Sequence, residues 1–486
     1  MSGIFVLVSP WMRKDNQAST KPSVRIRKFF PHQPTLDQEY FFDSMDTFLS
    51  RTAPKGASFI LKGYAGTGKT TVLAALVRAL PSIGLRAVML APTGRAAKVM
   101  SAYASKTAFT IHKIIYRARA ATAEGMYGFE VQKNYFQKSV FIVDEASMLA
   151  DDRSVGNSLL ADLIGFVFQN PENRLLLIGD IAQLPPVGSE DSPALDKNYL
   201  IRNFKLEVEE ALLTIVTRQQ LDSGILANAT ALREQVLNKA PKISFVSKGF
   251  KDFYRMTGER LEDGLRYAYD KFGLDNTMII TRSNKAAVMY NKYIRNAIFF
   301  YEDELSAGER LMIVKNNYTY MDSSDKVSFL ANGDFVEILK IRSFEELYGL
   351  RFAILELRLI DYPEEVPFEA RVILDTLHAN KPALGIEEWK ELYRLVAEDY
   401  QDLEKKHKIR EALRKDPYLN ALQVKYAYTL TCHKSQGGQW DAVFVDQGYL
   451  NKEQLDKNYI RWLYTAMTRA KKELFIVNFH DNFFIR

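Results

Sequence analysis

Short apolar runs recur along this chain, and each is followed by a polar or glycine-rich loop. In the first half these runs are Phe59 to Leu61, Val88 to Ala91, Val140 to Val143 and Leu175 to Ile178. Strands that are apolar on both faces are typical of a parallel sheet covered by helices, and such a sheet binds ligands beyond the carboxyl ends of its strands. The pattern returns in Met278 to Ile280, Val443 to Val445 and Leu474 to Val477. It predicts an α/β fold with two parallel-sheet units, one toward each end of the chain.

Two stretches interrupt this pattern. Residues 116–139 contain two glycines and the alternating Tyr127, Phe129 and Val131, which predicts a small β-hairpin. Residues 308–425 form a longer insertion, whose first part is expected to contain short strands and a turn at 332–334. Its later part, residues 386–415, is a long charged helical region, which we interpret as a solvated, salt-bridged support.

These features divide the chain into four parts. Residues 1–30 carry six basic side chains among small polar residues and are expected to be a flexible basic leader, with a frayed terminus as the alternative. Residues 31–215 form the first α/β domain, which includes the hairpin insertion at 116–139. The second α/β domain combines residues 216–307 with residues 426–486. Residues 308–425 are the insertion between these two segments.

Composition narrows the class of protein. With 486 residues the chain is too long for one ordinary core, and 47 % hydrophobic with 26 % charged residues is typical of a soluble globular protein. No apolar run approaches the roughly 20 residues that span a bilayer, so no membrane association is expected. The single Cys432 fits a reducing cytoplasm, and six scattered histidines argue against a structural zinc site. A net charge of +6 permits nucleic-acid binding without demonstrating it.

The first apolar run leads into the most specific motif of the chain. The sequence Gly-x-x-x-x-Gly-Lys-Thr at residues 63–70 follows the strand directly, and a helical run follows the loop. The glycines let the backbone wrap closely around a phosphate, and the helix N-terminus adds positive charge. Lys69 is placed to reach the terminal phosphates, and the Thr70 hydroxyl is placed to ligate Mg²⁺. The motif predicts a nucleotide site with contacts from Gly63, Gly66, Thr67, Gly68, Lys69, Thr70 and Thr71.

Polar side chains follow two more of the buried runs. Asp144 and Glu145 come directly after Val143, where one carboxylate suits Mg²⁺ held through water and the other suits polarising an attacking water. Gln183, in the segment 179–186, is a candidate sensor of the γ-phosphate, with a plain strand-end turn as the alternative. The amide of Gln38 suits an adenine edge, although a surface glutamine is the ordinary case.

Two arginines are candidates for stabilising phosphoryl charge. Arg218 stands in Thr-Arg-Gln, and Arg469 ends the segment 464–469. A guanidinium fork matches the charge that develops on a transferring phosphoryl group. An ordinary surface arginine is the alternative for each, so their assignment depends on the wider pattern.

Taken in order, the motifs resemble those of superfamily 1 helicases, in the branch of RecD and Dda. The segments that carry the resemblance are 63–70, 91–97, 144–147, 179–186, 217–219, 433–437 and 464–469. The resemblance extends over nearly all the chain from residue 33 onward. It implies two RecA-like motor domains with ATP and Mg²⁺ at their interface, and it adds Gly437 to the nucleotide contacts. The implied activity is ATP-dependent DNA unwinding with movement from 5′ to 3′ on single-stranded DNA.

The resemblance also suggests a path for DNA across both motor domains. The loops concerned supply Pro92, Thr93, His112, Asn284, His433 and Lys434. Short hydroxyls, amides and a few cations suit a phosphate backbone bound without sequence preference, and a buried turn histidine is an equal alternative for His112. The hairpin resembles a strand-separating pin with Phe129 as its wedge, and residues 308–425 resemble an SH3-like module with a helical arm. The implied partners are single-stranded DNA and duplex junctions, bound by a monomeric motor.

Other functions stay open. An RNA or RNA–DNA motor would share these motifs, because the sequence holds no test for the 2′-hydroxyl. A nucleic-acid-stimulated ATPase that acts as a switch without unwinding is a rival of another class, and the intact Glu145, Arg218 and Arg469 argue against it. A small-molecule kinase would leave the C-terminal motifs unexplained.

Overall fold

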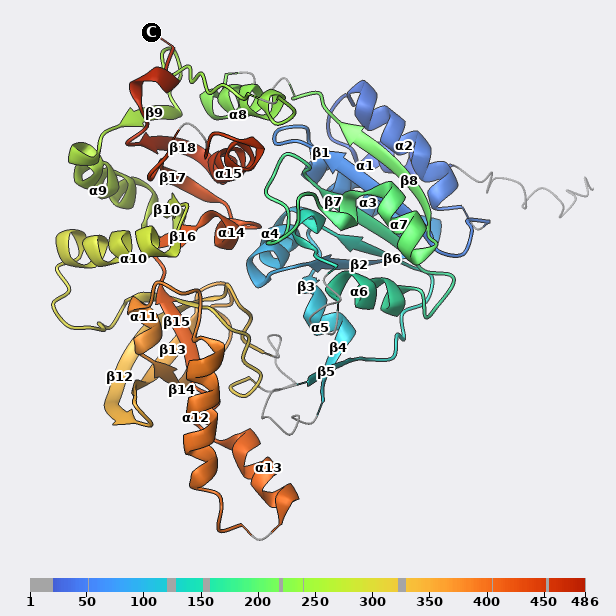
Figure 1. Ribbon diagram of the computed structural model, residues 1–486. Helices are drawn as coiled ribbons and strands as arrows, with labels where there is room; N and C mark the ends of the chain where they lie inside the picture. The colour runs from blue at the N-terminus through green and yellow to red at the C-terminus, as the bar shows by residue number, and fades with distance from the viewer. Residues whose placement is uncertain are drawn as a thin grey trace, which may run out of the picture.

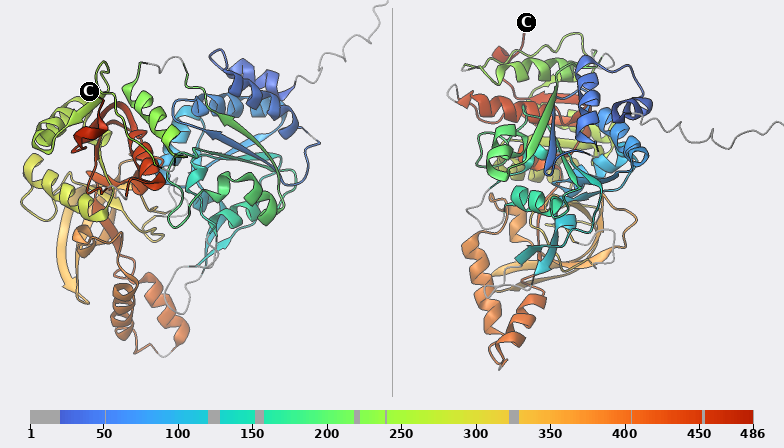
Figure 2. Two further views of the ribbon diagram at one scale, coloured as in Figure 1. Left: turned by 45° about the horizontal axis from the view of Figure 1, so that its top comes forward. Right: turned by 90° about the vertical axis from the view of Figure 1, so that its right-hand side faces the viewer.

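Two parallel sheets lie side by side, and a β-barrel with a helical arm lies below them in Figure 1. The computed structural model describes residues 21–50, 52–119, 128–151, 158–217, 222–238, 240–321, 329–403, 405–451 and 454–485. Both views of Figure 2 show the arm projecting away from the sheets. The predicted fold class, two RecA-like parallel-sheet domains with a hairpin and an SH3-like insertion with a helical arm, is confirmed.

The first sheet has the strand order β3-β2-β6-β7-β1-β8, and all its strands are parallel. The strands are β1 (Ala57–Gly63), β2 (Arg86–Ala91), β3 (Ala108–Thr110), β6 (Ser139–Val143), β7 (Arg174–Gly179) and β8 (Glu207–Leu213). The helices around it are α1 (Pro22–Phe29), α2 (Leu36–Phe48), α3 (Lys69–Ile83), α4 (Gly94–Ala104), α5 (Ile111–Ile115), α6 (Leu159–Val167) and α7 (Lys197–Phe204). Because β2, β6, β7 and β1 are neighbours, the loops after them meet at one edge of the sheet.

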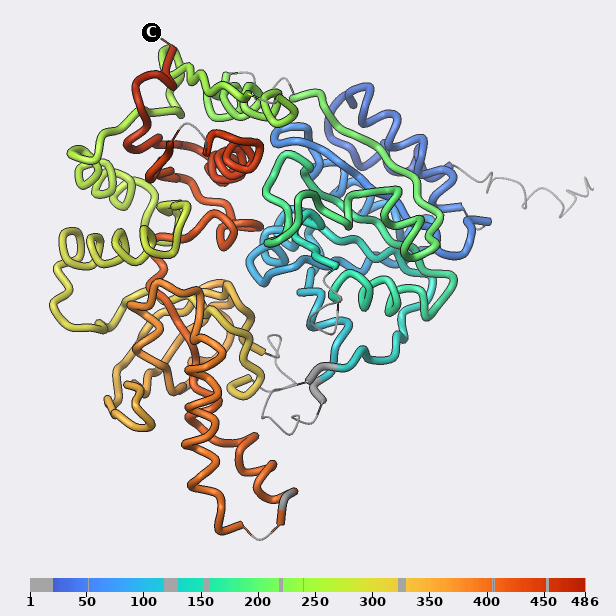
Figure 3. Tube along the Cα trace, viewed as in Figure 1, coloured from blue at the N-terminus to red at the C-terminus, as the bar shows by residue number. Residues whose placement is uncertain are grey.

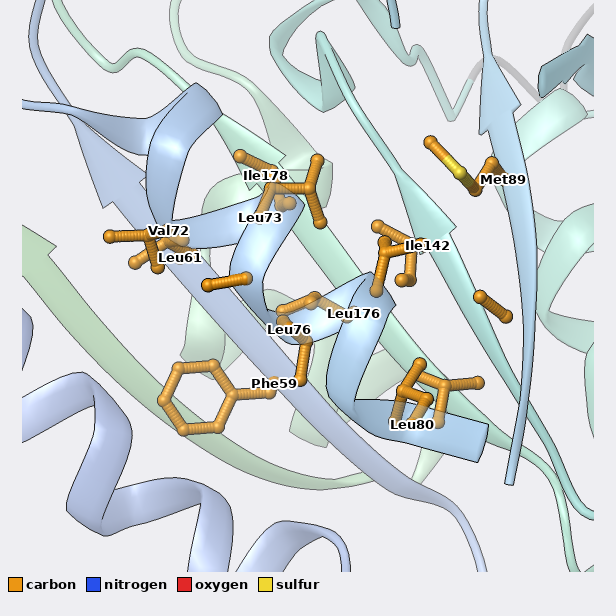
Figure 4. Packing of buried hydrophobic residues seen from close by; sticks show 14 of the residues in the cluster. Phe59, Leu61, Val72, Leu73, Leu76, Leu80, Met89, Ile142, Leu176 and Ile178 are labelled. Carbon is orange, nitrogen blue, oxygen red and sulfur yellow. The ribbon is translucent and has the colours of Figure 1, made fainter. Parts of the chain in front are cut away.

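Helix α3 packs its apolar face on the first sheet, as Figure 4 shows. The buried side chains in this contact are Phe59, Leu61, Val72, Leu73, Leu76, Leu80, Ile142, Leu176 and Ile178. Left-handed glycines lie at both ends of the helix, Gly68 with φ +81° and Gly84 with φ +83°. A side chain is strained at these angles, so glycine is required where the loop turns into the helix.

The expectation of a flexible leader up to residue 30 is wrong from Pro22 onward. Residues 22–29 form α1, in which Ser23 donates hydrogen bonds from its N and Oγ atoms to Asp46 at 2.8 and 3.0 Å. Arg27 forms ion pairs with Glu39 and Asp43 on α2 at 2.6 and 2.7 Å. The basic side chains therefore dock a helix on α2, while residues 1–20 lie outside the described ranges.

The second sheet is also parallel, with the order β16-β10-β17-β18-β9. Its strands are β9 (Phe253–Met256), β10 (Thr277–Thr281), β16 (Thr429–Thr431), β17 (Trp440–Asp446) and β18 (Ala470–Val477). Its helices are α8 (Gly224–Gln235), α9 (Leu261–Phe272), α10 (Asn284–Tyr293), α14 (Cys432–Ser435) and α15 (Lys457–Met467). Across the described ranges of the chain, we find no helix with the length and apolar character needed to cross a membrane.

The two insertions contain the remaining elements. The hairpin pairs β4 (Tyr116–Arg119) with β5 (Gly128–Val131) in antiparallel register. The closed barrel contains β11 (Arg310–Ile313), β12 (Phe335–Leu347), β13 (Leu350–Leu359), β14 (Phe368–Ile373) and β15 (Leu422–Tyr426). Between β14 and β15 lie α11 (Asp375–His378), α12 (Ile386–Glu398) and α13 (Lys406–Lys415). The charged region predicted as one long helical stretch is thus two helices, α12 and α13, that form the arm.

The barrel shares a hydrophobic core with the second sheet. Figure 3 shows the chain leaving this domain after α10, forming the barrel and the arm, and returning to the sheet. One buried cluster joins Ile279 and Phe444 of the sheet to Leu311, Val336 and other barrel residues. Apolar contacts of this kind make the barrel and the second sheet domain one packed body.

The barrel meets the first sheet domain through polar groups instead. Lys98 Nζ on α4 lies 3.1 Å from Asp361 Oδ1 of the barrel. Asp334 Oδ2 accepts a hydrogen bond from Ala331 N at 2.7 Å, and its Oδ1 atom is buried without a partner in the described part of the chain. A methyl group added to Gly94 would collide with Asp334 Oδ1, so this carboxyl lies against the start of α4. Burial raises the pKa of Asp334 to about 7.

We expect Asp334→Asn to remove a pH dependence of folding stability. The unfolded carboxyl ionises near pH 4, at roughly its ordinary pKa, whereas the folded carboxyl keeps its proton up to about pH 7. The folded state therefore binds an extra proton between these values, and wild-type stability falls as the pH rises through this window. Urea midpoints at about pH 5 and about pH 7.5 measure this fall. Equal pH dependence of wild type and variant would contradict the assignment.

Candidate nucleotide and DNA site

The strand ends of the two sheets face each other across a cavity of about 920 Å³. The first sheet domain contributes the loop after β1, the residues after β6 and β7, and one face of α4. The second contributes the residues around Gly437 and Arg469. Of the residues predicted from sequence, those that line the cavity are Gly66, Gly68, Lys69, Thr70, Thr71, Asp144, Glu145, Gln183, Gly437 and Arg469.

The loop at residues 63–70 has the form of a phosphate cradle. Gly66 and Gly68 have φ angles of +77° and +81°, which turn the backbone tightly around the loop. Lys69 Nζ donates hydrogen bonds to the carbonyl oxygens of Gly63 at 2.6 Å and Tyr64 at 2.9 Å. The ammonium group is thus held inside the loop, where it would meet the terminal phosphates.

Gln38 supports this loop from beneath. Its Nε2 atom donates to Thr67 O at 3.0 Å, and its Oε1 atom accepts from Thr35 N at 3.0 Å, which caps α2. Gln38 is 1 % exposed, so it is no ordinary surface glutamine. A methyl group on Gly68 would lie 2.7 Å from Gln38 Nε2, which is a second reason for glycine there. Recognition of adenine by Gln38 stays a prediction.

The two carboxylates after β6 have different environments. Asp144 Oδ1 accepts from Glu145 N at 2.9 Å, and Asp144 Oδ2 accepts from the Tyr103 hydroxyl at 2.5 Å. Glu145 has a left-handed backbone, with φ +52°, and its Oε1 atom lies 3.6 Å from Arg469 Nη1. Burial raises the pKa of Glu145, and Arg469 acts against that shift. Asp144 is thus fixed by hydrogen bonds, and Glu145 faces a cation from the other domain.

Hydrogen bonds join the two domains across the cavity. The Tyr464 hydroxyl on α15 accepts from Ala65 N at 2.8 Å and donates to Asp180 Oδ2 at 2.7 Å. Leu184 N donates to Thr465 Oγ1 and Leu184 O accepts from Gln436 Nε2, both at 2.9 Å. These residues fix the second domain on the phosphate loop and on the segment that holds Gln183.

The remaining phosphate-sensing candidates occupy distinct positions. Gln183 is 6 % exposed, and its Oε1 atom has no hydrogen-bond partner in the described ranges. The Arg469 side chain is 3 % exposed, and its Nε atom donates to Thr465 O at 3.1 Å. Arg218 lies outside the described residues.

The predicted DNA contacts come from both sheet domains. Thr93 Oγ1 accepts from Ala96 N at 3.2 Å, so Pro92 and Thr93 form the turn that starts α4. Asn284 and Lys434 line one small cavity of the second domain, and His433 is exposed beside them. Lys434 Nζ donates to Asn332 Oδ1 of the barrel, and burial lowers the pKa of Lys434 to about 8.

Two other candidates belong to the hairpin and its base. His112 on α5 lies beside Tyr116, with ring centres 5.4 Å apart, and burial lowers the pKa of His112. Phe129 pairs with Ala118 in the hairpin, but its side chain lies outside the described part of the structure, as does Tyr127. The wedge assignment for Phe129 stays a prediction.

Two residues of the cleft were missed by sequence reasoning. Tyr103 shares one face of α4 with Ala96 and Val99, and this spacing was a usable signal for a side chain that faces the cavity. Tyr464 begins the segment 464–469 that carries the family resemblance, but nothing in that segment indicated that its hydroxyl bonds to the other domain.

Two family models match the chain in the order of the two sheets. A model described as an AAA domain matches residues 47–242, which contain β1 to β8. A model described as a UvrD-like helicase C-terminal domain matches residues 426–477, which contain β16, β17 and β18. The first match contains the phosphate loop and also α8 of the second domain, and the second match contains Gly437 and Arg469.

Relatives of known activity match over different lengths. The ATP-dependent RecD2 DNA helicase of Deinococcus radiodurans is 35 % identical over 131 residues, which are 26 % of this chain and 16 % of that protein. The ATP-dependent DNA helicase dda of Enterobacteria phage T4 is 25 % identical over 439 residues, which are 86 % of this chain and 93 % of that protein. The chain thus spans a small part of the RecD2 relative and nearly all of dda. The chain belongs to the superfamily 1B helicases, in the RecD/Dda-like branch.

A solved structure resembles this superfamily 1B member along most of its length. It is the crystal structure of the Pif1 helicase from Bacteroides in complex with ADP-AlF3 and ssDNA. The TM-score is 0.48 at 14 % identity, with 94 % of this chain and 95 % of that chain covered.

We expect Tyr464→Phe to weaken nucleotide binding by this superfamily 1B member about 10-fold, because two hydrogen bonds between the domains are lost. Binding of a fluorescent ATP analogue measures the effect. Tyr459→Phe is the matched control, since Tyr459 is buried on the same helix and its hydroxyl has no partner in the described ranges. An equal loss in both variants would show that the α15 tyrosines act only through packing.

Proposed function

We propose that this protein is an ATP-dependent DNA helicase that moves from 5′ to 3′ along single-stranded DNA. The observation that carries the proposal is the position of Arg469, whose Nη1 atom lies 3.6 Å from Glu145 Oε1. Glu145 belongs to the first sheet domain, and Arg469 reaches the same cavity from the second. Because the reactive groups are divided between two bodies, relative motion of the domains makes or breaks the site.

Each group in the cleft has a role in hydrolysis. Lys69 would bind the terminal phosphates, and the Glu145 carboxylate would accept a proton from the attacking water. Arg469, with Arg218 as a second candidate, would stabilise charge on the transferring phosphoryl group. Gln183 would report the γ-phosphate to the second domain, because its neighbour Leu184 bonds to Thr465 and Gln436.

The residues present fit a magnesium ion carried by the nucleotide. Thr70 lies exposed in the first turn of α3, and Asp144 offers a carboxylate at a strand end, so both supply the oxygen donors that Mg²⁺ prefers. In the described ranges no three acidic, histidine or cysteine side chains form a metal cluster, which suits an ion bound largely by phosphate and water. Bound Mg²⁺ would neutralise phosphate charge.

The DNA strand is proposed to cross both domains. Its contacts would be Pro92, Thr93, His112, Asn284, His433 and Lys434, and the hairpin with Phe129 would separate the duplex. Lys434 is bonded to Asn332 in the structure, so a phosphate would have to replace that contact. We further propose a monomeric motor that acts at single-strand–duplex junctions in the cytoplasm.

The RecD2 and dda relatives are ATP-dependent DNA helicases, which supports DNA as the substrate. An RNA motor and an ATPase switch without unwinding are the competing functions. The first rival, an RNA motor, is tested by comparing how strongly single-stranded DNA and RNA of the same sequence stimulate ATP hydrolysis. The second rival, an ATPase switch, is tested by a strand-displacement assay, because a switch would hydrolyse ATP without displacing a strand.

Two substitutions test the division of labour in the cleft. We expect Lys69→Ala to abolish ATP binding and turnover, because the loop loses its phosphate cation. Glu145→Gln should retain ATP binding and stall hydrolysis, because an amide does not accept the proton. Equilibrium binding and steady-state hydrolysis measure the two effects, and near-normal turnover in either variant would remove the corresponding assignment.

The direction of movement along single-stranded DNA is tested with tailed duplexes. We expect displacement of a labelled strand from a duplex with a 5′ single-stranded tail, and little from a 3′-tailed or blunt duplex. The three substrates share the same duplex sequence and are incubated with ATP and Mg²⁺. Efficient unwinding from the 3′ tail alone would overturn the direction while leaving the motor assignment in place.

A further inference from the structure

Helix α4 connects the proposed DNA path with the proposed metal carboxylate. It has 11 residues and begins directly after Thr93, at the loop that we assign to DNA. At 1.5 Å per residue it is about 16 Å long. Its last turn carries Tyr103, which lies in the nucleotide cleft together with Ala96 and Val99 of the same helix. Both ends of α4 make contacts that have no assigned role in nucleotide or DNA binding.

At the C-terminal end, Tyr103 holds Asp144. The Tyr103 hydroxyl donates to Asp144 Oδ2 at 2.5 Å, while Asp144 Oδ1 accepts from Glu145 N at 2.9 Å. Each carboxylate oxygen is therefore fixed by one donor and keeps a lone pair for a metal-bound water. An oriented carboxylate binds a metal complex with less loss of freedom than a rotating one.

At the N-terminal end, Arg95 lies over two aromatic rings from other parts of the molecule. Its guanidinium carbon is 4.3 Å from the ring centre of Trp440 in the second sheet and 4.8 Å from that of Phe335 in the barrel. Within the described ranges, Arg95 makes no hydrogen bond or ion pair through its side chain. Cation–π contacts with both rings therefore hold it in place.

The start of α4 is packed closely as well. A methyl group on Gly437, which has φ +74°, would lie 2.6 Å from Ala96 Cβ. Asp334 of the barrel lies against Gly94 on the same turn. Since the barrel and the second sheet share a core, they contact the start of α4 as one body. Movement of that body relative to the first domain must displace Arg95 and the helix, or break these contacts.

We propose that Tyr103 is a positioning residue for Asp144, and that α4 transmits movement of the second domain and the barrel to this carboxylate. In this proposal Arg95 is the residue of α4 that senses the movement, because it contacts both of them. The inference rests on the proposed function, in which Asp144 holds Mg²⁺ and Thr93 contacts DNA. DNA binding would thereby set how well Asp144 is oriented for the nucleotide–magnesium complex. In this proposal Tyr103 acts through Asp144, whose Oδ2 atom it holds, and does not itself react.

Tyr103→Phe removes the hydroxyl and keeps the ring. We expect the Mg²⁺ concentration for half-maximal binding of a fluorescent ATP analogue to rise about 10-fold, which is typical when a metal ligand loses its hydrogen-bond partner. Tyr199→Phe is the matched control, because the Tyr199 hydroxyl bonds to Asp151 at 2.6 Å in the same domain, away from the cleft. Its Mg²⁺ requirement should equal that of the wild type. An unchanged requirement in Tyr103→Phe, or an equal change in both variants, would overturn the proposal.

Arg95→Lys tests transmission along the helix. At saturating single-stranded DNA, we expect the DNA stimulation of ATP hydrolysis to fall about 3-fold, because lysine stacks less well on aromatic rings than arginine does. A double variant with Arg95→Lys and Tyr103→Phe should show the same DNA stimulation of ATP hydrolysis as Tyr103→Phe alone, since both changes act on one path. Additive losses would refute transmission through α4.

The outcomes also separate this inference from the proposed function. The binding assay needs no turnover, so it tests the contact between Tyr103 and Asp144 even in a protein that hydrolyses nothing. A wild-type protein without DNA-stimulated ATPase would refute the motor. An active wild type whose Tyr103→Phe variant keeps the normal Mg²⁺ requirement would refute only the inference.

Discussion

Hydrogen bonds between α15 and the strand ends of the first sheet hold the two halves of the nucleotide cleft together. Besides Tyr464 and Thr465, Arg461 donates to Glu190 O at 2.6 Å and lies 2.6 Å from Asp191 Oδ1. Without these contacts Arg469 would not lie near Glu145, and the cavity would lack its second wall. Neither sheet contains a complete site, so catalytic geometry depends on how the two domains are placed.

The barrel takes part in this arrangement through contacts of two kinds. Its apolar core is continuous with that of the second sheet, whereas its contacts with the first domain are a salt bridge, a buried carboxyl and the Arg95 stack. Apolar cores are costly to separate, while a few polar contacts exchange readily with water or phosphate. These contacts tie the barrel more firmly to the second domain than to the first.

Much of the architecture could be predicted because it depends on local patterns. The apolar runs identified strands of both parallel sheets, and the glycine–lysine loop identified the nucleotide cavity. Local patterns carried no information on contacts such as Tyr464 with Ala65, or Arg95 with Trp440, because these join segments that are far apart in sequence. Helix α1 was missed for another reason: its two buried residues are too few to outweigh its basic side chains.

The insertion of the barrel affects how the chain folds. Strand β10 cannot pair with its neighbours β16 and β17 until the barrel and the arm have been synthesised, because both strands come later in the chain. Bringing such distant strands together costs loop entropy and slows folding. Here β15 closes the barrel by pairing with β11 and β14, and β16 follows β15 after two residues, Ala427 and Tyr428. Closure of the barrel thus delivers β16 to the edge of β10, so the loop entropy spent on pairing β15 with β11 brings both pairings together.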